Sequence, residues 1–316
     1  MTNKSFSIVF PGQGSQSVGM LGDIAAQFGE VKETFTEASD LLGYDMWKLV
    51  CQGPAEELDK TTHTQPALLT GSYAIWRILQ SRKPLKPAML AGHSLGEYTA
   101  LVCAGALAFS DAVRIVAARG QYMQEAVPPG IGAMAAIIGL DETQVAAICK
   151  QSVTSEDEIL SPANFNSIGQ IVVAGHQAAV IRAVALAKAQ GAKLATLIPV
   201  SVPSHCELMR PAAVRLVELL AGMTLQQPMI PVLSNVDVMP YRGADSIRDG
   251  LVRQLYSPVR WVETIQQMIQ AGVSHITECG PGKVLTGLNK RIDKSLQLMA
   301  TSDLAGLEAV LTLETE

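Results

Sequence analysis

The chain has 316 residues, of which 48% are hydrophobic and 17% charged, a composition typical of a compact globular protein with a large core. Its formal net charge of -5 argues against a general nucleic-acid binder. Five widely spread cysteines without a C-x-x-C pair predict reduced thiols rather than a disulfide framework or a metal site. Without a signal-peptide pattern or an apolar run of about 18 residues, the sequence predicts a cytoplasmic protein that does not enter the membrane.

The N-terminal region predicts a strand, a glycine-rich loop and then helices. Residues 6–10 (FSIVF) form an apolar, β-prone run, and residues 11–16 (PGQGSQ) can turn backbone N–H groups inward at its end. This loop has neither a Gly-Lys-Ser/Thr ending nor a complete G-x-G-x-x-G, so we reject a phosphate loop. Helices are expected over about 23–42 and from Thr64 onward.

Residues 91–97 (AGHSLGE) carry the strongest chemical signal. They follow a short apolar run and open a helical run over 95–105, and a strand, a Gly-x-Ser-x-Gly turn and a helix together form the nucleophile-elbow pattern. Such a turn strains the serine backbone and projects Ser94 Oγ above the sheet, beside the N–H groups of the new helix. The alternative is an ordinary glycine-rich turn with Ser94 as a helix N-cap.

Arg119 lies on the wrong face of the next predicted helix for a charged residue. This helix is expected to be capped by Ser110 and to run to about Val127, and Arg119 falls among Ala112, Val116 and Met123 on its core face. A buried arginine needs an anion, which could be a buried Asp or Glu or the carboxylate of a substrate. The spacing leaves both alternatives open.

Residues 128–199 predict a small domain inserted into a larger one. Their order of elements is β-α-β-β-α-β, the ferredoxin-like arrangement, and the remaining segments 1–127 and 200–316 form an α/β core with a mostly parallel sheet. The core is completed by a strand over 231–235, helices over 249–256 and 262–270, a strand over 275–278 and a last helix over 283–293. A ligand cleft is expected between the two domains, over Ser94.

A nucleophilic serine needs a general base, and His205 is the best of the five histidines. It follows an apolar, strand-like stretch downstream of the serine, whereas the others read as capping, surface or structural residues (His63, His93, His176, His275). No Asp or Glu lies between Lys193 and His205, where a hydrolase would carry its acid. A histidine oriented by a backbone carbonyl or amide favours acyl transfer over hydrolysis.

Over nearly its whole length the chain resembles the malonyl-CoA:acyl carrier protein transacylases of bacterial fatty acid synthesis. The resemblance rests on six motifs in order: residues 10–16 (FPGQGSQ), 64–68 (TQPAL), 92–98 (GHSLGEY), 164–166 (NFN), 202–205 (VPSH) and 280–285 (GPGKVL). It implies a hydrolase-like α/β core with a ferredoxin-like subdomain. It also implies malonyl-CoA and acyl carrier protein as substrates and partners, with no cofactor and no metal.

By position, the resemblance makes Ser94 the nucleophile and His205 the base of a two-step ping-pong exchange through a malonyl-serine ester. The backbone N–H groups of Gln13 and Leu95 would then form the oxyanion hole. The malonyl group would pass from coenzyme A to the phosphopantetheine thiol of the carrier protein.

The same resemblance assigns Arg119 to the malonyl carboxylate, and Gln254 to the orientation of the histidine through its backbone carbonyl. Asn164 and Asn166 match polar residues of the cleft, with hydrogen bonding within a strand turn as the alternative. Ser204 is small where malonyl-selective polyketide synthase acyltransferases often carry an aromatic residue, which leaves more room for a methyl-branched substrate.

Three alternatives remain beside the transacylase: a serine hydrolase or thioesterase, a non-catalytic scaffold subunit, and an acyltransferase that serves a polyketide synthase. The last predicted helix is basic and is a candidate for docking the acidic carrier protein and the CoA phosphates, with a solvated charged helix as the alternative (Lys283, Lys290, Arg291, Lys294).

Overall fold

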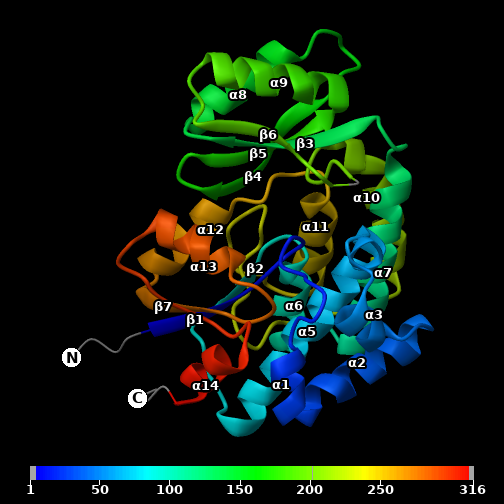
Figure 1. Ribbon diagram of the computed structural model, residues 1–316, viewed down its shortest axis with the longest axis vertical. Coiled ribbons are helices and arrows are strands. Elements are labelled where there is room, and N and C mark those ends of the chain that lie inside the picture. Colours follow the sequence, from blue (N-terminus) through cyan, green and yellow to red (C-terminus); the bar gives the residue numbers. More distant parts are fainter. Residues whose placement is uncertain (1–4, 201, 313–316) are drawn as a thin grey trace.

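Two separate four-stranded sheets organise the chain in the computed structural model, which describes residues 5–200 and 202–312. The larger, lower part of the molecule contains a parallel sheet, and the upper part contains an antiparallel one (Figure 1). The fold is therefore α/β, as the sequence predicted, with the antiparallel sheet apart from the parallel one.

The parallel sheet has the strand order β2-β1-β7-β8, with β2 (Leu90–Gly92), β1 (Ser5–Phe10), β7 (Val273–Glu278) and β8 (Gln297–Ala300). The strand expected over 231–235 is reduced to isolated bridges, a parallel one between Val232 and Leu90 and an antiparallel one between Leu233 and Pro240. Because β1 and β2 are parallel neighbours, their carboxyl ends lie side by side. The glycine-rich loop and the turn that carries Ser94 therefore emerge at the same edge.

Helices cover both faces of this sheet, which explains why strand β1 is fully buried from Ser7 to Phe10. Successive side chains of a strand point to opposite faces. Ile8 and Phe10 accordingly pack with the cluster of α5 (Thr61–Arg82) and α6 (Gly96–Cys103), whereas Val9 packs with that of α12 (Trp261–Gln270).

The remaining helices of the larger part surround this core. On the N-terminal side they are α1 (Gly22–Gln27), α2 (Gly29–Leu42), α3 (Met46–Gln52), α4 (Ala55–Leu58) and α7 (Phe109–Ala126). After the upper sheet come the short 3-10 helix η1 (Glu207–Met209), α10 (Arg210–Ala221), α11 (Ala244–Gln254), α13 (Val284–Ile292) and α14 (Leu304–Thr312).

Two details of the N-terminal helices differ from the prediction. The helix expected over 23–42 is broken at Phe28, whose extended backbone separates α1 from α2. Ser110 does not cap α7, because the helix already begins at Phe109 and Ala108 occupies the N-cap position without a side-chain bond.

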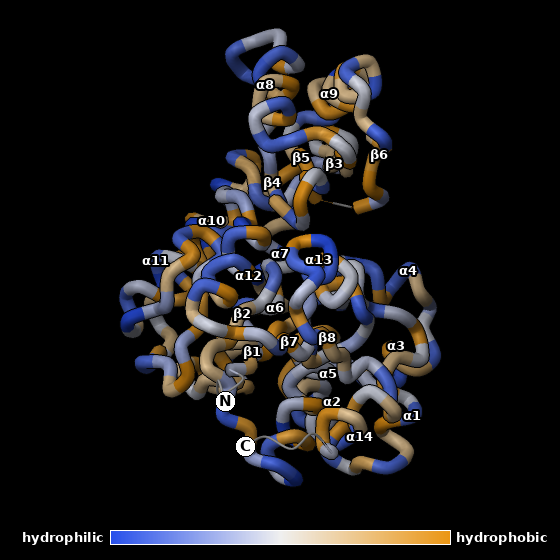
Figure 2. Tube along the Cα trace, turned by 90° about the vertical axis from the view of Figure 1, so that its left-hand side faces the viewer, coloured by the Kyte–Doolittle hydropathy of each residue, from blue (hydrophilic) through white to orange (hydrophobic). Residues whose placement is uncertain are grey.

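The upper sheet is built from residues 132–198, in the predicted order of elements. These are β3 (Gly132–Ile138), α8 (Glu142–Ser152), β4 (Leu160–Ser167), β5 (Gln170–His176), α9 (Gln177–Ala189) and β6 (Leu194–Ile198). The strand order is β4-β5-β3-β6, and α8 and α9 lie on the face away from the rest of the molecule (Figure 2).

Strand β4 joins this upper part to the core. Phe165 N donates to Val259 O at 2.9 Å, and Val259 N donates to Ala163 O at 2.9 Å. The small sheet is thereby held above the edge at which β1 and β2 end.

Candidate active site

The turn between β2 and α6 holds Ser94 in a left-handed backbone conformation, with a φ of 51°. Its two glycines are required by contact. A Cβ at Gly92 would lie 1.8 Å from the carbonyl carbon of Gly96, and a Cβ at Gly96 would lie 2.1 Å from Phe10 O. Only glycine lets strand and helix approach this closely, so the turn requires glycine at both positions.

Ser94 lies beside His205, 111 residues further along the chain. Ser94 Oγ is 2.8 Å from His205 Nε2, and His205 Nδ1 is 2.7 Å from the backbone oxygen of Gln254. A carbonyl oxygen can only accept, so the ring carries its hydrogen on Nδ1, and Nε2 is free to accept the serine proton. This fixes the tautomer without an acid.

The environment of His205 keeps its ring neutral. The side chain is 4% exposed, and burial together with the positive charge of Arg119 lowers its pKa to about 3. The ring is therefore a hydrogen-bond acceptor over the whole physiological pH range.

The route of the chain to His205 differs from the prediction. The described residues before it, 199–200 and 202–204, form no strand, because β6 ends at Ile198, and His205 sits in a turn with a φ of 63°. Its backbone N–H donates to Leu255 O at 3.0 Å, and its ring bonds to Gln254. The end of α11, rather than a strand, positions the histidine.

The other four histidines bond elsewhere. His93 Nε2 donates to Asn166 Oδ1 at 2.8 Å, and His63 Nδ1 donates to Glu57 O at 2.9 Å. His176 accepts from the backbone of Ile159, and His275 pairs with the adjacent Ser274.

Arg119 is 1% exposed and points at the serine. Its Nη2 donates to Ser94 Oγ at 3.2 Å and to Gln254 Oε1 at 2.9 Å, and its Nη1 donates to Gln65 Oε1 at 2.7 Å. Its Nε has no hydrogen-bond partner among the described residues, and the guanidinium lies 5.5 Å from the ring centroid of Tyr98. No ion pair of Arg119 occurs within residues 5–200 and 202–312. Of the two alternatives, the structural ion pair is the one that the geometry disfavours.

Two backbone N–H groups near the serine donate to no acceptor among the described residues. The N–H of Ser94 itself donates to Asn235 Oδ1 at 2.8 Å. For Gln13 and Leu95, by contrast, the described part of the chain offers no acceptor for the backbone N–H. The loop of Gln13 is pressed against the turn, since a Cβ at Gly12 would lie 2.5 Å from His93 O.

Asn164 and Asn166 lie on β4 and contribute to its link with the core. Asn166 bonds His93, the neighbour of the serine, as described above. Asn164 is buried, and its backbone forms an isolated bridge with Val259. Asn166 thus lies where the small sheet meets the Ser94 turn, and Asn164 where the sheet meets Val259.

Sequence reasoning missed two buried residues that support the site. Asn235 accepts from Ser94 N and donates from Nδ2 to Gly92 O at 2.7 Å, which braces both ends of the turn. Glu97 is fully buried and accepts from Tyr241 Oη at 2.6 Å, from Asn235 N at 3.0 Å and from Gln254 Nε2. A carboxylate in the otherwise apolar helix α6 was a signal available from the sequence; Asn235 gave none.

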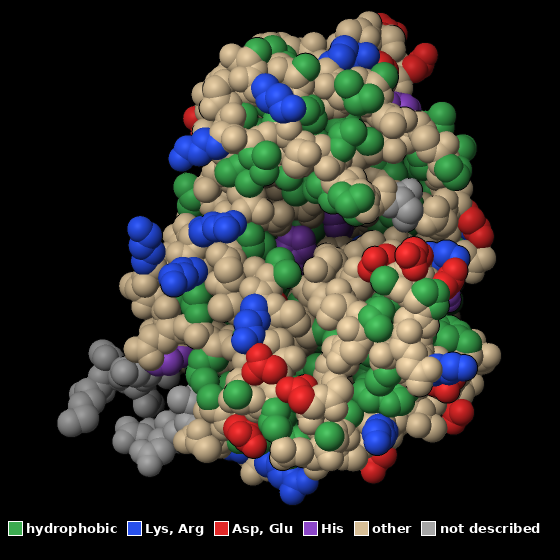
Figure 3. All heavy atoms as spheres, in the orientation of Figure 1, with side chains coloured by type: hydrophobic (Ala, Val, Ile, Leu, Met, Phe, Trp, Pro, Cys, Tyr) green, Lys and Arg blue, Asp and Glu red, His purple; other side chains and the backbone are tan. Residues whose placement is uncertain are grey.

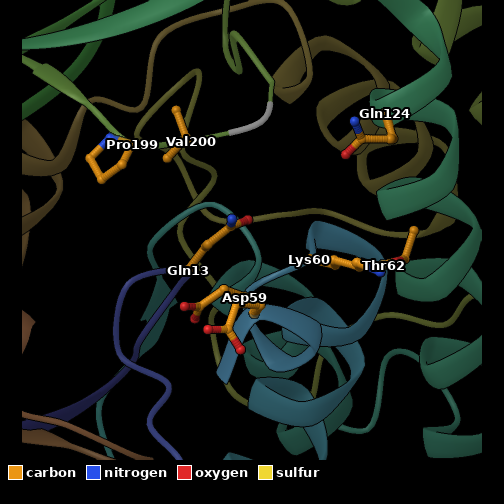
Figure 4. A pocket seen from close by; sticks show the side chains of 8 residues that line it. Gln13, Asp59, Lys60, Thr62, Gln124, Pro199 and Val200 are labelled. Carbon is orange, nitrogen blue, oxygen red and sulfur yellow. The ribbon is translucent and has the colours of Figure 1, made fainter. Parts of the chain in front are cut away.

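A cleft opens beside this constellation. The space-filling view shows a hollow between the upper and lower parts, with histidine side chains visible inside it (Figure 3). A cavity of about 510 Å³ adjoins the glycine-rich loop, and in Figure 4 Gln13 reaches into it below Pro199 and Val200. Glu56, Asp59, Lys60, Thr62 and Gln124 line the rest of it.

The basic residues of α13 are partly engaged within the molecule. Lys283, just before the helix, forms a 2.8 Å ion pair with Asp303, and Arg291 donates to Gln170 Oε1 at 2.7 Å. Lys290 and Lys294 belong to none of the ion pairs between described residues.

The arrangement can perform acyl chemistry: a strained serine, a neutral histidine that can take its proton, free N–H groups for an oxyanion, and a buried cation next to the nucleophile. No helix in the described chain has the length and apolar character needed to span a membrane. Nor do the His, Cys, Asp and Glu side chains of the described residues gather into a group that could hold a metal ion.

Comparison with known proteins agrees with this chemistry. The acyl transferase domain family matches residues 7–308. Malonyl CoA-acyl carrier protein transacylase from Escherichia coli K12 is 57% identical, with 98% of this chain and 99% of the relative covered. The Bacillus subtilis 168 protein of the same name is 45% identical, with 98% of both chains covered.

Solved structures give the same result. The acyl carrier protein S-malonyltransferase of Vibrio cholerae has a TM-score of 0.94 at 56% identity and covers 97% of this chain and 100% of its own. A malonyl-transacylase solved in complex with a type II polyketide synthase acyl carrier protein has a TM-score of 0.95 at 54% identity, covering 98% and 99%. The chain therefore belongs to the acyl transferase domain family and, within it, to the malonyl CoA-acyl carrier protein transacylases.

Proposed function

We propose that this protein transfers a malonyl group from malonyl-CoA to the phosphopantetheine thiol of acyl carrier protein, in fatty acid biosynthesis, through an ester on Ser94. The observation that carries the proposal is one cluster of three side chains. Ser94 Oγ is 2.8 Å from the base His205 and 3.2 Å from the buried guanidinium of Arg119. A nucleophile beside a cation suits an acyl group that ends in a carboxylate.

In the first half-reaction, His205 Nε2 takes the proton of Ser94 Oγ while the oxygen attacks the thioester carbonyl of malonyl-CoA. The backbone N–H groups of Gln13 and Leu95 stabilise the resulting oxyanion. The C–S bond then breaks, the proton on Nε2 passes to the departing CoA sulfur, and the malonyl-Ser94 ester remains.

In the second half-reaction the roles reverse. His205 Nε2 takes the proton of the phosphopantetheine thiol, the sulfur attacks the ester carbonyl, and the same N–H groups hold the oxyanion. Ser94 Oγ leaves and recovers the proton from Nε2. Gln254 O orients the ring through Nδ1 in both halves, so a carbonyl replaces the acid of a hydrolase triad.

Arg119 binds the malonyl carboxylate in this scheme. Its Nη2 donates to Ser94 Oγ, which places the guanidinium next to the reacting atom. The unpartnered Nε is a buried donor that an incoming carboxylate can satisfy. The proposal therefore includes selection for an acyl group with a free carboxylate.

We further propose that the Ser94 turn is a nucleophile elbow and that residues 128–199 form a ferredoxin-like subdomain inserted between 1–127 and 200–316. The elbow is supported by the positive φ of Ser94 and by the glycines that flank it. The subdomain is supported by the antiparallel order β4-β5-β3-β6 and by its own apolar cluster. Asn164 and Asn166 then serve as the polar link between the two parts, beside the cleft.

The carrier protein is proposed to dock near α13, chiefly through Lys290, Arg291 and Lys294, because Lys283 is already paired with Asp303. A cytoplasmic location is proposed as well, and the five cysteines, all free, are consistent with a reducing compartment. No nucleic acid or membrane takes part in the scheme.

A polyketide synthase is the second candidate for the acyl acceptor. The observation in its favour is the 54% identical malonyl-transacylase that was solved in complex with a type II polyketide synthase acyl carrier protein. Both acceptors carry a phosphopantetheine thiol, so the chemistry at Ser94 is the same.

Malonyl-CoA alone, followed by mass spectrometry of the intact protein, tests the proposal. We expect a stoichiometric malonyl adduct on Ser94 that disappears when holo acyl carrier protein is added, and no adduct in Ser94→Ala. Rapid release of free malonate without a carrier would instead identify a thioesterase. The absence of any adduct on the folded wild-type protein would favour a scaffold.

A further inference from the structure

Glu97 is a buried carboxylate that the proposed mechanism does not use. It lies on α6, three residues after the nucleophile, and none of the ion pairs between described residues includes it. Every partner that it has donates a hydrogen: Tyr241 Oη and Asn235 N to Oε1, and Gln254 Nε2 to Oε2. The surroundings of Glu97 therefore require a side chain in which both oxygens accept hydrogen bonds, as they do in a carboxylate.

Gln254 connects this carboxylate to the reacting groups. Its amide NH2 donates to Glu97 Oε2 and, at 2.9 Å, to Ser94 O, so its oxygen must face the other way and accept from Arg119 Nη2. The direction of the amide is decided by where its acceptors lie. Without an acceptor at Glu97, the NH2 group of Gln254 would keep only one of its two acceptors, Ser94 O.

The chain of contacts from Arg119 to Gln254 to Glu97 also balances charge. A carboxylate in direct contact would occupy the fork of the guanidinium, which the substrate is proposed to use. Placed one amide away, Glu97 supplies the negative charge without binding the guanidinium itself, and Arg119 Nε keeps no partner among the described residues. The positive charge of Arg119 in turn favours the ionised form of Glu97 and acts to lower its pKa.

Glu97 is also connected to the histidine and to the serine, in each case through one intervening residue. Gln254 holds the ring of His205 through its backbone oxygen, so the residue that Glu97 anchors is the one that fixes the tautomer. Asn235, whose N–H donates to Glu97, braces Ser94 through its side chain. One carboxylate thereby contacts the supports of all three reacting groups.

We propose that Glu97 is a positioning residue for acyl transfer: its carboxylate fixes the direction of the Gln254 amide and so sets the guanidinium of Arg119 and the ring of His205. The inference rests on the proposed function. Amide replacement cannot reproduce the role. Whichever way the new amide of Glu97→Gln turns, its NH2 group meets another N–H donor, either that of Asn235 or that of Gln254.

The pH dependence gives a readout that a purely structural role would not move. Burial raises the pKa of Glu97 to about 7, against hydrogen bonds and the charge of Arg119 that lower it. The titratable or charged groups that face it are Tyr241, Tyr98 and Arg119. Burial raises the pKa of both tyrosines and lowers the pKa of Arg119. The pKa of His205 is lowered to about 3, so the base does not titrate near neutrality.

The experiment is single-turnover formation of the malonyl-enzyme between pH 5.5 and 8.5, at saturating malonyl-CoA, followed by mass spectrometry of quenched samples. In wild type we expect the rate to fall as the pH drops below about 7, where Glu97 takes up a proton. In Glu97→Gln we expect a rate at pH 8 that is about 10- to 100-fold lower, as for a lost hydrogen bond to a charged group, and independent of pH.

Two further variants make the test specific. Tyr241→Phe removes one hydrogen-bond donor to the carboxylate, which should raise the pKa of Glu97. The fall of the rate at low pH, the acid limb of the pH profile, should then move to higher pH. Glu278→Gln is the matched control: Glu278 is also a buried carboxyl with a raised pKa, but it bonds Leu285 and Thr286 rather than the site. It should keep the acid limb of wild type.

An acid limb that persists in folded Glu97→Gln, or a rate equal to wild type at pH 8, would overturn the proposal. If circular dichroism shows that Glu97→Gln does not fold, Tyr241→Phe provides the test. An acid limb at the wild-type pH in that folded variant would also overturn the proposal. A wild-type protein that forms no malonyl ester would instead refute the proposed function.

Discussion

Replacing Arg119 with alanine separates the carboxylate-binding role from a structural one. The guanidinium is 1% exposed and donates to Ser94 Oγ, so a malonyl carboxylate would meet it away from bulk water. Truncating one partner of a buried, hydrogen-bonded charge pair costs about 3 kcal/mol, within a range of about 2–5. We therefore expect kcat/KM for malonyl transfer to fall about 100-fold.

Acetyl transfer gives the internal comparison, because an acetyl group has no carboxylate. Arg119→Ala removes one hydrogen bond to Ser94 Oγ, worth about 1 kcal/mol, so acetyl transfer should fall only about fivefold. The preference for malonyl should thus drop about 20-fold, measured as kcat/KM with malonyl-CoA and acetyl-CoA in parallel. Equal losses for both substrates would refute the reasoning and leave Arg119 a structural residue.

Arg114 offers a matched control on the same helix. It is exposed and pairs with Asp111 at 3.7 Å, one turn along α7. Arg114→Ala removes the same charge from the surface, where an ion pair contributes little. It should change neither rate by more than about twofold.

Gly92→Ala would set its Cβ 1.8 Å from a backbone carbon and should lower the free energy of unfolding by more than about 3 kcal/mol in urea. Gly287→Ala, which meets nothing within 4 Å in α13, should raise it by about 0.5–1 kcal/mol. Because the pKa of Glu97 is raised from 4.5 to about 7, the stability it contributes is present below pH 4.5 and lost as pH rises through 7. The unfolding free energy of Glu97→Gln minus that of wild type should therefore grow by about 2.5 kcal/mol between pH 5 and 8, and a constant difference would contradict this. Joint reversal of charge at Lys290 and Arg291 should raise the KM for carrier protein about tenfold at low salt; an unchanged KM would move the docking site elsewhere.

The sequence alone determined the features that depend on local chain geometry. The turn at Ser94 follows from glycines at fixed spacing around one serine, because no other residue allows strand and helix to approach so closely. The order of elements over 132–198 follows from the alternation of strand and helix patterns. The face of α7 that carries Arg119 follows from helical periodicity, which is why its burial was predictable.

Contacts between distant segments decided the rest. His205 lies beside Ser94 because the end of α11, about 50 residues further on, bonds both its backbone and its ring. The partner of Arg119 could not be chosen from spacing, since Gln65 and Gln254 come from α5 and α11. Glu97 became visible as a support only once Tyr241, Asn235 and Gln254 were seen to converge on it. The position of Ser94 at the top of a turn depends on local sequence. The base that takes its proton, the cation proposed to bind its substrate and the residues that hold these two groups are brought together only by the packing of the whole chain.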